Sequence, residues 1–171
     1  MRTIVGFLFL TAIYSCKMEE KEILSSRENT VKINELIDNW HEYAAEAKFE
    51  PYFDAMADSS VFIGTDASEI WSKKEFMKFS RPYFDKGKAW SFHPINRNIY
   101  FSEDHSIIWF DELLDTWMGT CRGSGVLVYQ NDSLKIKHYV LSVCVPNDDM
   151  NMIISVKSKN DSLFRVHFDP Q

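Results

Sequence analysis

Cysteine is scarce in this sequence, and the three cysteines that it contains form no metal-binding or redox motif. Cys16, Cys121 and Cys144 have neither the CxxC arrangement nor the ligand spacing of a structural zinc site. Runs of lysine and arginine are also missing, and the net charge is -6 at pH 7. A nucleic-acid partner is therefore not expected, because such a partner calls for a basic surface. We expect no metal and no other cofactor.

The N-terminal apolar run is too short to cross a bilayer as a helix. It extends from Ile4 to Ile13, follows a basic residue and precedes small residues, which is the pattern of a signal peptide. Cys16 resembles the lipid-modified cysteine of a bacterial lipobox, so we expect a signal peptide over residues 1–15 and a flexible tether over residues 16–29. The protein would then be exported and anchored to a membrane of a bacterial cell envelope. The alternative is a plain secretory signal with an incidental cysteine.

The rest of the sequence has the composition of one globular domain, with 45% apolar, 15% aromatic and 26% charged residues. Its first element is an amphipathic helix, because apolar residues recur at helical spacing: Ile33, Leu36, Ile37, Trp40 and Ala44. A short segment at Pro51 and the strand "SSVFIG" follow. Ser72 and Glu75 of "SKKE" form a capping box that starts another helix. We expect the buried face of that helix to consist of Phe76, Phe79 and Tyr83.

From residue 88 onward the sequence changes to β-strand patterns. Four long segments rich in β-branched and aromatic residues form two hairpins, with turns at "SED" and "NDS". Helices followed by an antiparallel meander predict an α+β fold in which the helices pack on one face of a curved sheet. We expect the domain to cover residues 30–150 and a C-terminal extension to cover residues 151–171.

This order of elements, together with "VFIGTDASEIW", "IIWFDELLD" and "RGSGVL", resembles the nuclear transport factor 2-like superfamily. Within it, the closest resemblance is to the SnoaL-like, or polyketide-cyclase-like, domains. The resemblance covers about residues 30–150 and implies a cone, in which a bent sheet wraps a long helix and leaves a pocket at the wide end. We also expect a homodimer through the sheet. Because similar domains serve as isomerases, dehydratases, cyclases or binding modules, the fold does not determine the function.

The first hairpin offers a candidate binding surface. If its turn has two residues, Trp90, Trp109 and Asp111 share one face of the sheet. We expect this aromatic face to line the pocket, where an acid of raised pKa could act as a general acid or base. The alternative is that the face is packed core or a dimer interface. Arg97 and Glu112 lie on the opposite face, where they predict a cross-strand ion pair.

The second hairpin supplies two further candidates. A two-residue turn there would place Cys121 opposite Cys144, and whether they form a disulfide depends on their separation. His138 and Arg122 would then point to opposite faces, so only one of them could join the pocket. His138 is either a site residue or a structural histidine, and Arg122 could either hold an anionic ligand or neutralise Asp111.

Two residues outside the hairpins complete the set of candidates. Trp40 of the first helix is a candidate ligand contact. Asp66 follows the strand "SSVFIG", and the simplest account is that it bonds backbone amides of its own turn. In domains of similar fold, this loop also borders the pocket. Resemblance to scytalone-dehydratase-like sites implies a His/Asp pair, which His138 could form with Asp66 or Asp111.

The function that we expect is binding of a small apolar or amphipathic molecule by an exported, lipid-anchored domain. The first alternative is a small-molecule isomerase, dehydratase or cyclase that uses a pocket Asp or His. The second is a dimerisation or accessory module without a ligand. The position of Asp111 and His138 relative to one cavity distinguishes the enzyme from the binder.

Overall fold

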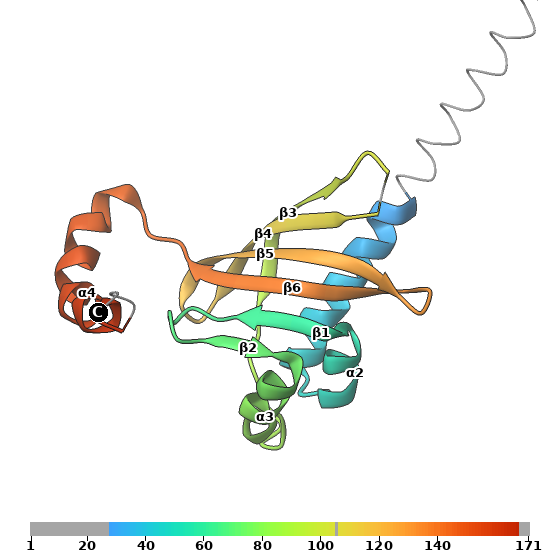
Figure 1. Cartoon of the computed structure of the whole chain (residues 1–171), viewed down its shortest axis with the longest axis horizontal. Helices are drawn as coiled ribbons and strands as arrows, with labels where there is room; N and C mark the ends of the chain where they lie inside the picture. The colour runs from blue at the N-terminus through green and yellow to red at the C-terminus, as the bar shows by residue number, and fades with distance from the viewer. Residues whose placement is uncertain (1–27, 105, 168–171) are drawn as a thin grey trace, which may run out of the picture.

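The computed structural model describes residues 28–104 and 106–167 (Figure 1). The predicted signal peptide and the lipidation site Cys16 lie outside the described residues. The first element is a helix over residues 28–45, the N-terminal helix. The later elements of the domain are α2 (Phe49–Asp54), β1 (Met56–Ile63), β2 (Ile70–Ser72), α3 (Lys73–Phe84), β3 (His93–Phe101), β4 (Ile108–Thr116), β5 (Gly119–Gln130) and β6 (Ser133–Val143).

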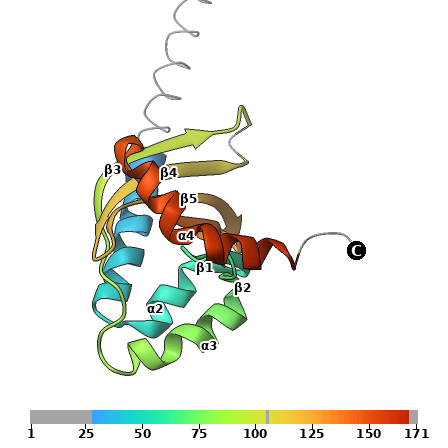
Figure 2. The ribbon, with the colours of Figure 1, turned by 90° about the vertical axis from the view of Figure 1, so that its left-hand side faces the viewer.

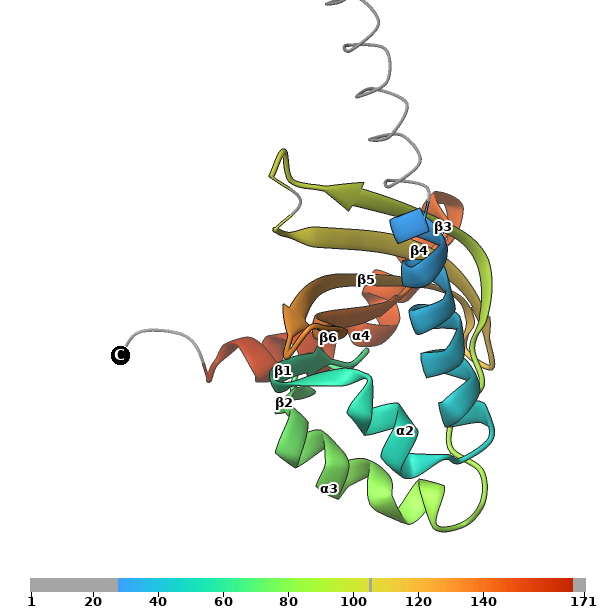
Figure 3. The same cartoon turned by 90° about the vertical axis from the view of Figure 1, so that its right-hand side faces the viewer.

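The strands form one curved sheet in the order β2-β1-β6-β5-β4-β3. β1 runs parallel to β6, and all other neighbouring strands are antiparallel. The sheet curves around the N-terminal helix, while α2 and α3 lie together near the C-terminal end of that helix (Figure 2, Figure 3). The predicted α+β architecture is therefore confirmed. The sequence pattern does not predict β2, because three residues are too few to show an alternation.

The C-terminal segment after β6 consists of η1 (Asn147–Asp149) and α4 (Met150–Arg165). α4 stands beyond the end of the sheet where the β1–β2 loop and the β4–β5 turn lie (Figure 1, Figure 2). It contains no buried residue. In the part of the chain that the structure describes, no helix is long and apolar enough to cross a membrane.

The N-terminal helix presents its predicted apolar stripe to the sheet. Ile33, Ile37, Trp40 and Ala44 are all buried. The ring centroid of Trp40 lies 5.0 Å from that of Tyr52 in α2 and 4.8 Å from that of Tyr139 in β6. Because burying each large apolar side chain contributes about 1.5–3 kcal/mol, this stripe anchors the helix in the cone.

α3 begins as the sequence predicts but buries a different stripe. Ser72 and Glu75 form the predicted capping box. The buried residues of α3 are Phe76, Ser80 and Phe84. Phe79 and Tyr83, in contrast, are 40% and 46% exposed, so their predicted burial is wrong. The Ser80 hydroxyl donates to the Phe76 carbonyl, which lets a polar residue lie on the inner face of the helix.

The register of the first hairpin differs from the prediction by two residues. Asp111 lies opposite Asn98, because the connection between β3 and β4 is longer than two residues. A shift by an even number of residues leaves the same side chains on a shared face. The face that points into the cone, however, is the one opposite to that of Trp109 and Asp111. It carries Ile108, Phe110, Glu112 and Leu114, all buried. The prediction that Trp109 and Asp111 line the interior is therefore wrong, and Trp109 is 41% exposed.

The second hairpin turns one residue earlier than predicted. Asn131 and Asp132 both have positive φ, 51° and 59°, as a type I′ turn requires. A bulge next to Val126 then leaves His138 opposite Val126. The register is thus shifted by an odd number, which moves side chains to the other face.

This shift corrects two predictions about the second hairpin. Arg122 and His138 lie on the same face, the outer one, and not on opposite faces. Cys121 pairs with Val143 and not with Cys144, and both cysteines are free.

The predicted ion pair between Arg97 and Glu112 is present and lies inside the cone. Arg97 Nε and Nη2 donate to Glu112 Oε2 at 2.9 and 2.8 Å. Tyr139 Oη donates to Oε1 at 2.9 Å, and His41 Nε2 lies 2.8 Å from the same oxygen. Because an ionised carboxylate only accepts, His41 must donate. Glu112 is buried, but each of its two carboxylate oxygens accepts two hydrogen bonds.

The balance of these contacts favours the ionised carboxylate. Burial alone would raise the pKa of Glu112, but hydrogen bonds and charge from His41 and Arg97 outweigh burial and lower that pKa below its ordinary value. Arg97 also donates Nη1 to Asp38 of the N-terminal helix at 2.8 Å. Glu112 therefore connects β4 to β3, β6 and the N-terminal helix.

We predict that Glu112→Gln lowers the free energy of unfolding by roughly 3–5 kcal/mol at pH 7, because Arg97 would lose its buried counter-charge and keep only the more exposed Asp38. The difference in free energy of unfolding between the variant and the wild type should become smaller as the pH falls. A lowered folded-state pKa gives stability that is present above the ordinary carboxyl pKa and is lost as pH falls through the folded value. Urea unfolding at pH 7, 5 and 3.5 measures the gap, with the exposed Glu35→Gln as control. A gap that stays constant down to pH 3.5 would contradict this account.

Candidate functional site

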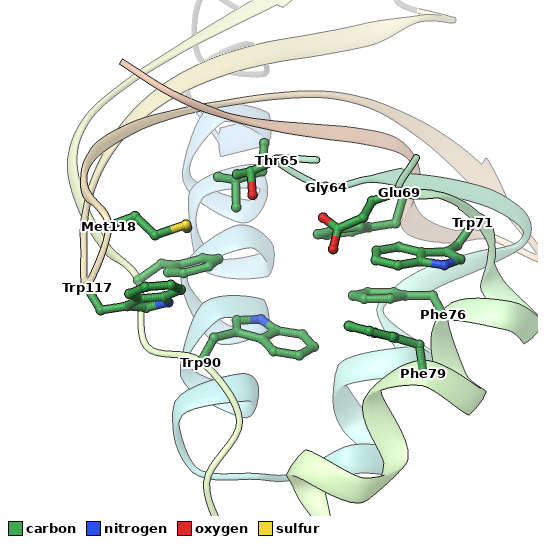
Figure 4. Close-up of a pocket in the computed structure, with 12 residues that line it drawn as sticks. Gly64, Thr65, Glu69, Trp71, Phe76, Phe79, Trp90, Trp117 and Met118 are labelled. Carbon is green, nitrogen blue, oxygen red and sulfur yellow. The ribbon is translucent and has the colours of Figure 1, made fainter. Parts of the chain in front are cut away.

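A cavity of about 150 Å³ opens at the wide end of the cone (Figure 4). Its lining is largely aromatic and comes from segments that are distant in sequence. The lining residues are Phe62, Gly64, Thr65, Glu69, Trp71, Phe76, Phe79, Trp90, Phe92, Trp117, Met118 and Leu141. Pockets for drug-sized ligands measure about 300–1,000 Å³, so this cavity suits a small molecule or one end of a longer one.

One wall is a stack of near-parallel rings. Trp71 lies 5.6 Å from Phe76 and 4.5 Å from Phe79 between ring centroids, at interplanar angles of 13° and 24°. Phe76 is also stacked on Trp90 at 5.6 Å. The capping box at Ser72 produces this wall, because it turns the chain from β2 directly into α3 and brings Trp71 beside the first turn of the helix.

The facing wall comes from the turn between β4 and β5. Trp117 and Met118 point from this turn toward the ring stack (Figure 4). Thr116 Oγ1 accepts from the Met118 amide at 3.0 Å and donates to the Gly119 carbonyl at 2.9 Å. Gly119 has a φ of +85°, a conformation that favours glycine. The turn is therefore well defined, yet Trp117 is 82% exposed.

The polar edge of the cavity is the loop between β1 and β2. Glu69 and Thr65 point from this loop into the space between the two aromatic walls (Figure 4). Glu69 Oε2 accepts from the Asp66 amide at 3.2 Å, and the Gly64 amide donates to the Glu69 carbonyl at 2.9 Å. A Cβ at position 64 would lie 2.1 Å from Oε2, so the glycine makes room for the carboxylate. Among the described lining residues, only Glu69 has an ionisable side chain.

The loop also explains the position of Asp66. Its Oδ1 accepts from the Ser68 amide at 2.9 Å and from the Ser68 hydroxyl, which confirms the predicted bonding within its own turn. These hydrogen bonds lower the pKa of Asp66. Asp66 does not line the aromatic cavity but a separate hollow between the loop and α4. Sequence reasoning missed Glu69, although it stands two positions before Trp71, the spacing at which side chains of an extended segment share a face.

The two remaining tryptophans predicted as ligand contacts have different positions. Trp90 lines the cavity. Trp40 does not, because it is buried in the core beneath Tyr52 and Tyr139.

The other candidates from the sequence meet on the outer face of the sheet. Trp109 is stacked on Tyr100 at 5.8 Å. Asp111 accepts from the Tyr100 hydroxyl at 2.9 Å and lies 3.9 Å from an Arg122 nitrogen. Trp109, Val126 and His138 form one row across β4, β5 and β6. The structure brings these candidates together, but on the face turned away from the cavity.

The residues that the structure describes contain no group of three or more His, Cys, Asp or Glu side chains that could hold a metal ion. The groups that line the cavity and can contact a bound molecule include Glu69, Thr65 and the aromatic rings.

Residues 33–146 match the family model described as the SnoaL-like domain. A nuclear transport factor 2-like protein of unknown function from Pseudomonas putida is similar in structure, with a TM-score of 0.57 at 12% identity over 68% of this chain and 87% of that one. A cystatin-like protein of unknown function from Nostoc punctiforme has a TM-score of 0.56 at 14% identity over 67% and 90%. ActVI-ORFA from Streptomyces coelicolor has a TM-score of 0.54 at 9% identity over 67% and 96%. At these identities the likeness shows the fold alone. No curated protein matches the sequence significantly.

We predict that Gly64→Ala displaces the Glu69 carboxylate from the cavity edge, because the new Cβ would overlap Oε2. The carboxylate would lose its hydrogen bond from the Asp66 amide, so the free energy of unfolding should fall by less than about 1 kcal/mol. A crystal structure of the variant, with thermal unfolding, measures both effects. An unmoved carboxylate would contradict the packing described for this loop.

Gly123→Ala provides the contrast. There the added Cβ would lie 2.2 Å from the hydroxyl of Tyr139, which is fixed in the core by Glu112. Overpacking at a rigid site should lower the free energy of unfolding by roughly 1–3 kcal/mol.

Proposed function

The chain belongs to the SnoaL-like domain family of the nuclear transport factor 2-like superfamily, and from this premise we propose that it binds a small, largely apolar molecule in the aromatic cavity. The observation that carries the proposal is the pair of facing aromatic walls with a single polar edge. Ligand sites combine these features, with apolar surface for affinity and a few polar groups for orientation. Trp117 is 82% exposed, so a bound ligand would bury more of its ring than of the other, better packed lining residues.

Binding is favoured over turnover by the placement of the ionisable groups. The cavity is lined by one such group among the described residues, Glu69. Asp111 and His138, which an isomerase, dehydratase or cyclase was expected to use, lie on the outer face of the sheet. A molecule bound in the cavity therefore cannot use these two residues as an acid–base pair.

The outer face supports a further proposal, the homodimer expected from the sequence. Trp109 and Tyr100 are each 41% exposed there, and their stacked rings form an apolar area. Asp111 and Arg122 lie beside them and carry opposite charges. A surface with both charges and a central aromatic pair can complement a second copy of itself.

Export and lipid anchoring also remain proposals, and they rest on the sequence around Cys16. The polar stretch after this cysteine separates it from the matched domain, which begins at residue 33. A tether of this kind would let the cavity face the solvent while the lipid holds the chain to the membrane.

We predict that the full-length chain, expressed in a bacterium with a lipoprotein pathway, is recovered with membranes and has an acylated Cys16 as its first residue. Cys16→Ser should move it out of the membrane fraction, because no acyl chains would then bind the bilayer. Cell fractionation and mass spectrometry of the mature N-terminus measure both. An unmodified N-terminus downstream of residue 16 would show that the segment is a plain secretory signal.

The binding proposal is tested with two exposed tryptophans on different surfaces. We predict that Trp117→Ala weakens the binding of a neutral probe, tert-butylbenzene, by roughly threefold to tenfold, as loss of an aromatic contact of about 0.5–1.5 kcal/mol implies. Trp109→Ala is the matched control and should leave the affinity unchanged, because Trp109 lies on the outer face. Chemical shifts in ¹H–¹⁵N NMR titrations report the affinity and the site. Loss of binding in Trp109→Ala alone would assign the ligand to the outer face.

A further inference from the structure

We infer that the ligand of the aromatic cavity carries a methylated ammonium group, which the aromatic rings and the Glu69 carboxylate recognise together. This inference rests on the proposed function, since it names the chemical class of the molecule that the same cavity binds.

The first observation is a carboxylate without a positive partner. None of the ion pairs among the described residues involves Glu69. Lys157 of α4, which lines the neighbouring hollow, is paired with Asp161 at 3.4 Å. Glu69 is half-buried at the edge of an apolar cavity, where an unpaired charge is less well hydrated than on an open surface. A ligand cation would supply the missing partner.

The carboxylate is also held in place before any ligand arrives. The Asp66 amide donates to Glu69 Oε2 at 3.2 Å, and the missing side chain of Gly64 leaves the space that Oε2 occupies. The carboxylate of Asp66 lies in the same loop and stays ionised through its bonds to Ser68. The edge of the cavity is therefore negative, and an anionic ligand would be repelled.

The second observation is the aromatic lining. Trp71, Trp90 and Trp117 all line the cavity together with four phenylalanines. Ring faces attract cations through their quadrupoles, and tryptophan does so most strongly. Trp71, Phe76 and Trp90 are stacked on their neighbours, so the most open tryptophan face is that of Trp117, which is 82% exposed. A neutral apolar ligand would use the rings but leave Glu69 unpaired, whereas a cation on an apolar body would use both.

The scarcity of acceptors decides between a primary and a methylated ammonium. A primary ammonium has three N–H donors that need acceptors. The described lining side chains offer acceptor oxygens on Thr65 and Glu69 only. A trimethylammonium group has no N–H to satisfy, spreads its charge over methyl groups and packs well against rings. The cavity of about 150 Å³ is of a size to hold such a group with a small apolar neighbour.

The test compares three phenyl compounds of similar shape and different charge, using the full folded domain. They are phenyltrimethylammonium, tert-butylbenzene and benzenesulfonate. The cation should bind roughly tenfold more tightly than the neutral compound, as a cation–π contact with a partly exposed ion pair implies, and the anion should bind most weakly. The preference for the cation should shrink in 0.5 M NaCl, because salt screens the carboxylate.

Glu69→Gln assigns the effect to the carboxylate. Glutamine keeps an oxygen that can accept from the Asp66 amide, so the loop should stay folded. We expect the variant to lose roughly threefold in affinity for the cation, which is the share of the ion pair, and to keep the share of the cation–π contact. Its affinity for the neutral compound should stay unchanged. Glu35→Gln, an exposed glutamate on the N-terminal helix, is the matched control and should bind all three compounds like the wild type.

The possible results separate the inference from the proposed function. Equal binding of the cation and the neutral compound by the wild type would overturn the inference and leave the binding function standing. An unchanged cation preference in Glu69→Gln would overturn the role of the carboxylate. Failure of both compounds to bind would overturn the proposed function itself.

Discussion

The buried carboxylate of Glu112 is the constraint on which the rest of the structure depends. A charged group inside a protein is costly unless its oxygens are fully hydrogen-bonded. Here Arg97, Tyr139 and His41 supply those donors from β3, β6 and the N-terminal helix. Since the donors come from three elements, the sheet must curve around the helix to bring them together. The same contact decides which face of β4 is inside.

That constraint also determines where a ligand can bind. Glu112, His41 and Tyr139 are interior groups that could transfer protons, and they are hydrogen-bonded to one another. Burial, followed by the negative charge of Glu112, raises the pKa of Tyr139 well above its usual value, so its hydroxyl remains a donor. Aliphatic and aromatic side chains fill the core around these groups. The aromatic cavity lies at the wide end, between the β4–β5 turn and the loop at Glu69.

The sequence predicts the elements of this fold well and their register poorly. Helical spacing and the capping box at Ser72 are local signals, so they can be read from the chain alone. Register depends on the length of a connection and on bulges. A longer connection before Ile108 moves the first hairpin by two residues, and the turn at Asn131 with the bulge at Val126 moves the second by one. An odd shift changes the face of every side chain, which is why Arg122 and His138 were placed on opposite faces.

Apart from Trp90, the candidate site was missed for a related reason. One face of the first hairpin carries aromatic side chains with Asp111, and the other carries the charged pair Arg97 and Glu112. An aromatic wall with a polar group is typical of a ligand pocket, which predicts that Trp109 and Asp111 are inside. The argument fails because a carboxylate with enough donors is stable in the core, and burying it turns the aromatic side of β4 outward. The cavity then takes its walls from segments that the hairpin does not control, namely a turn with Trp117 and a loop with Glu69. Predicting their approach requires the curvature of the sheet, which depends on bulges and on contacts between residues far apart in sequence.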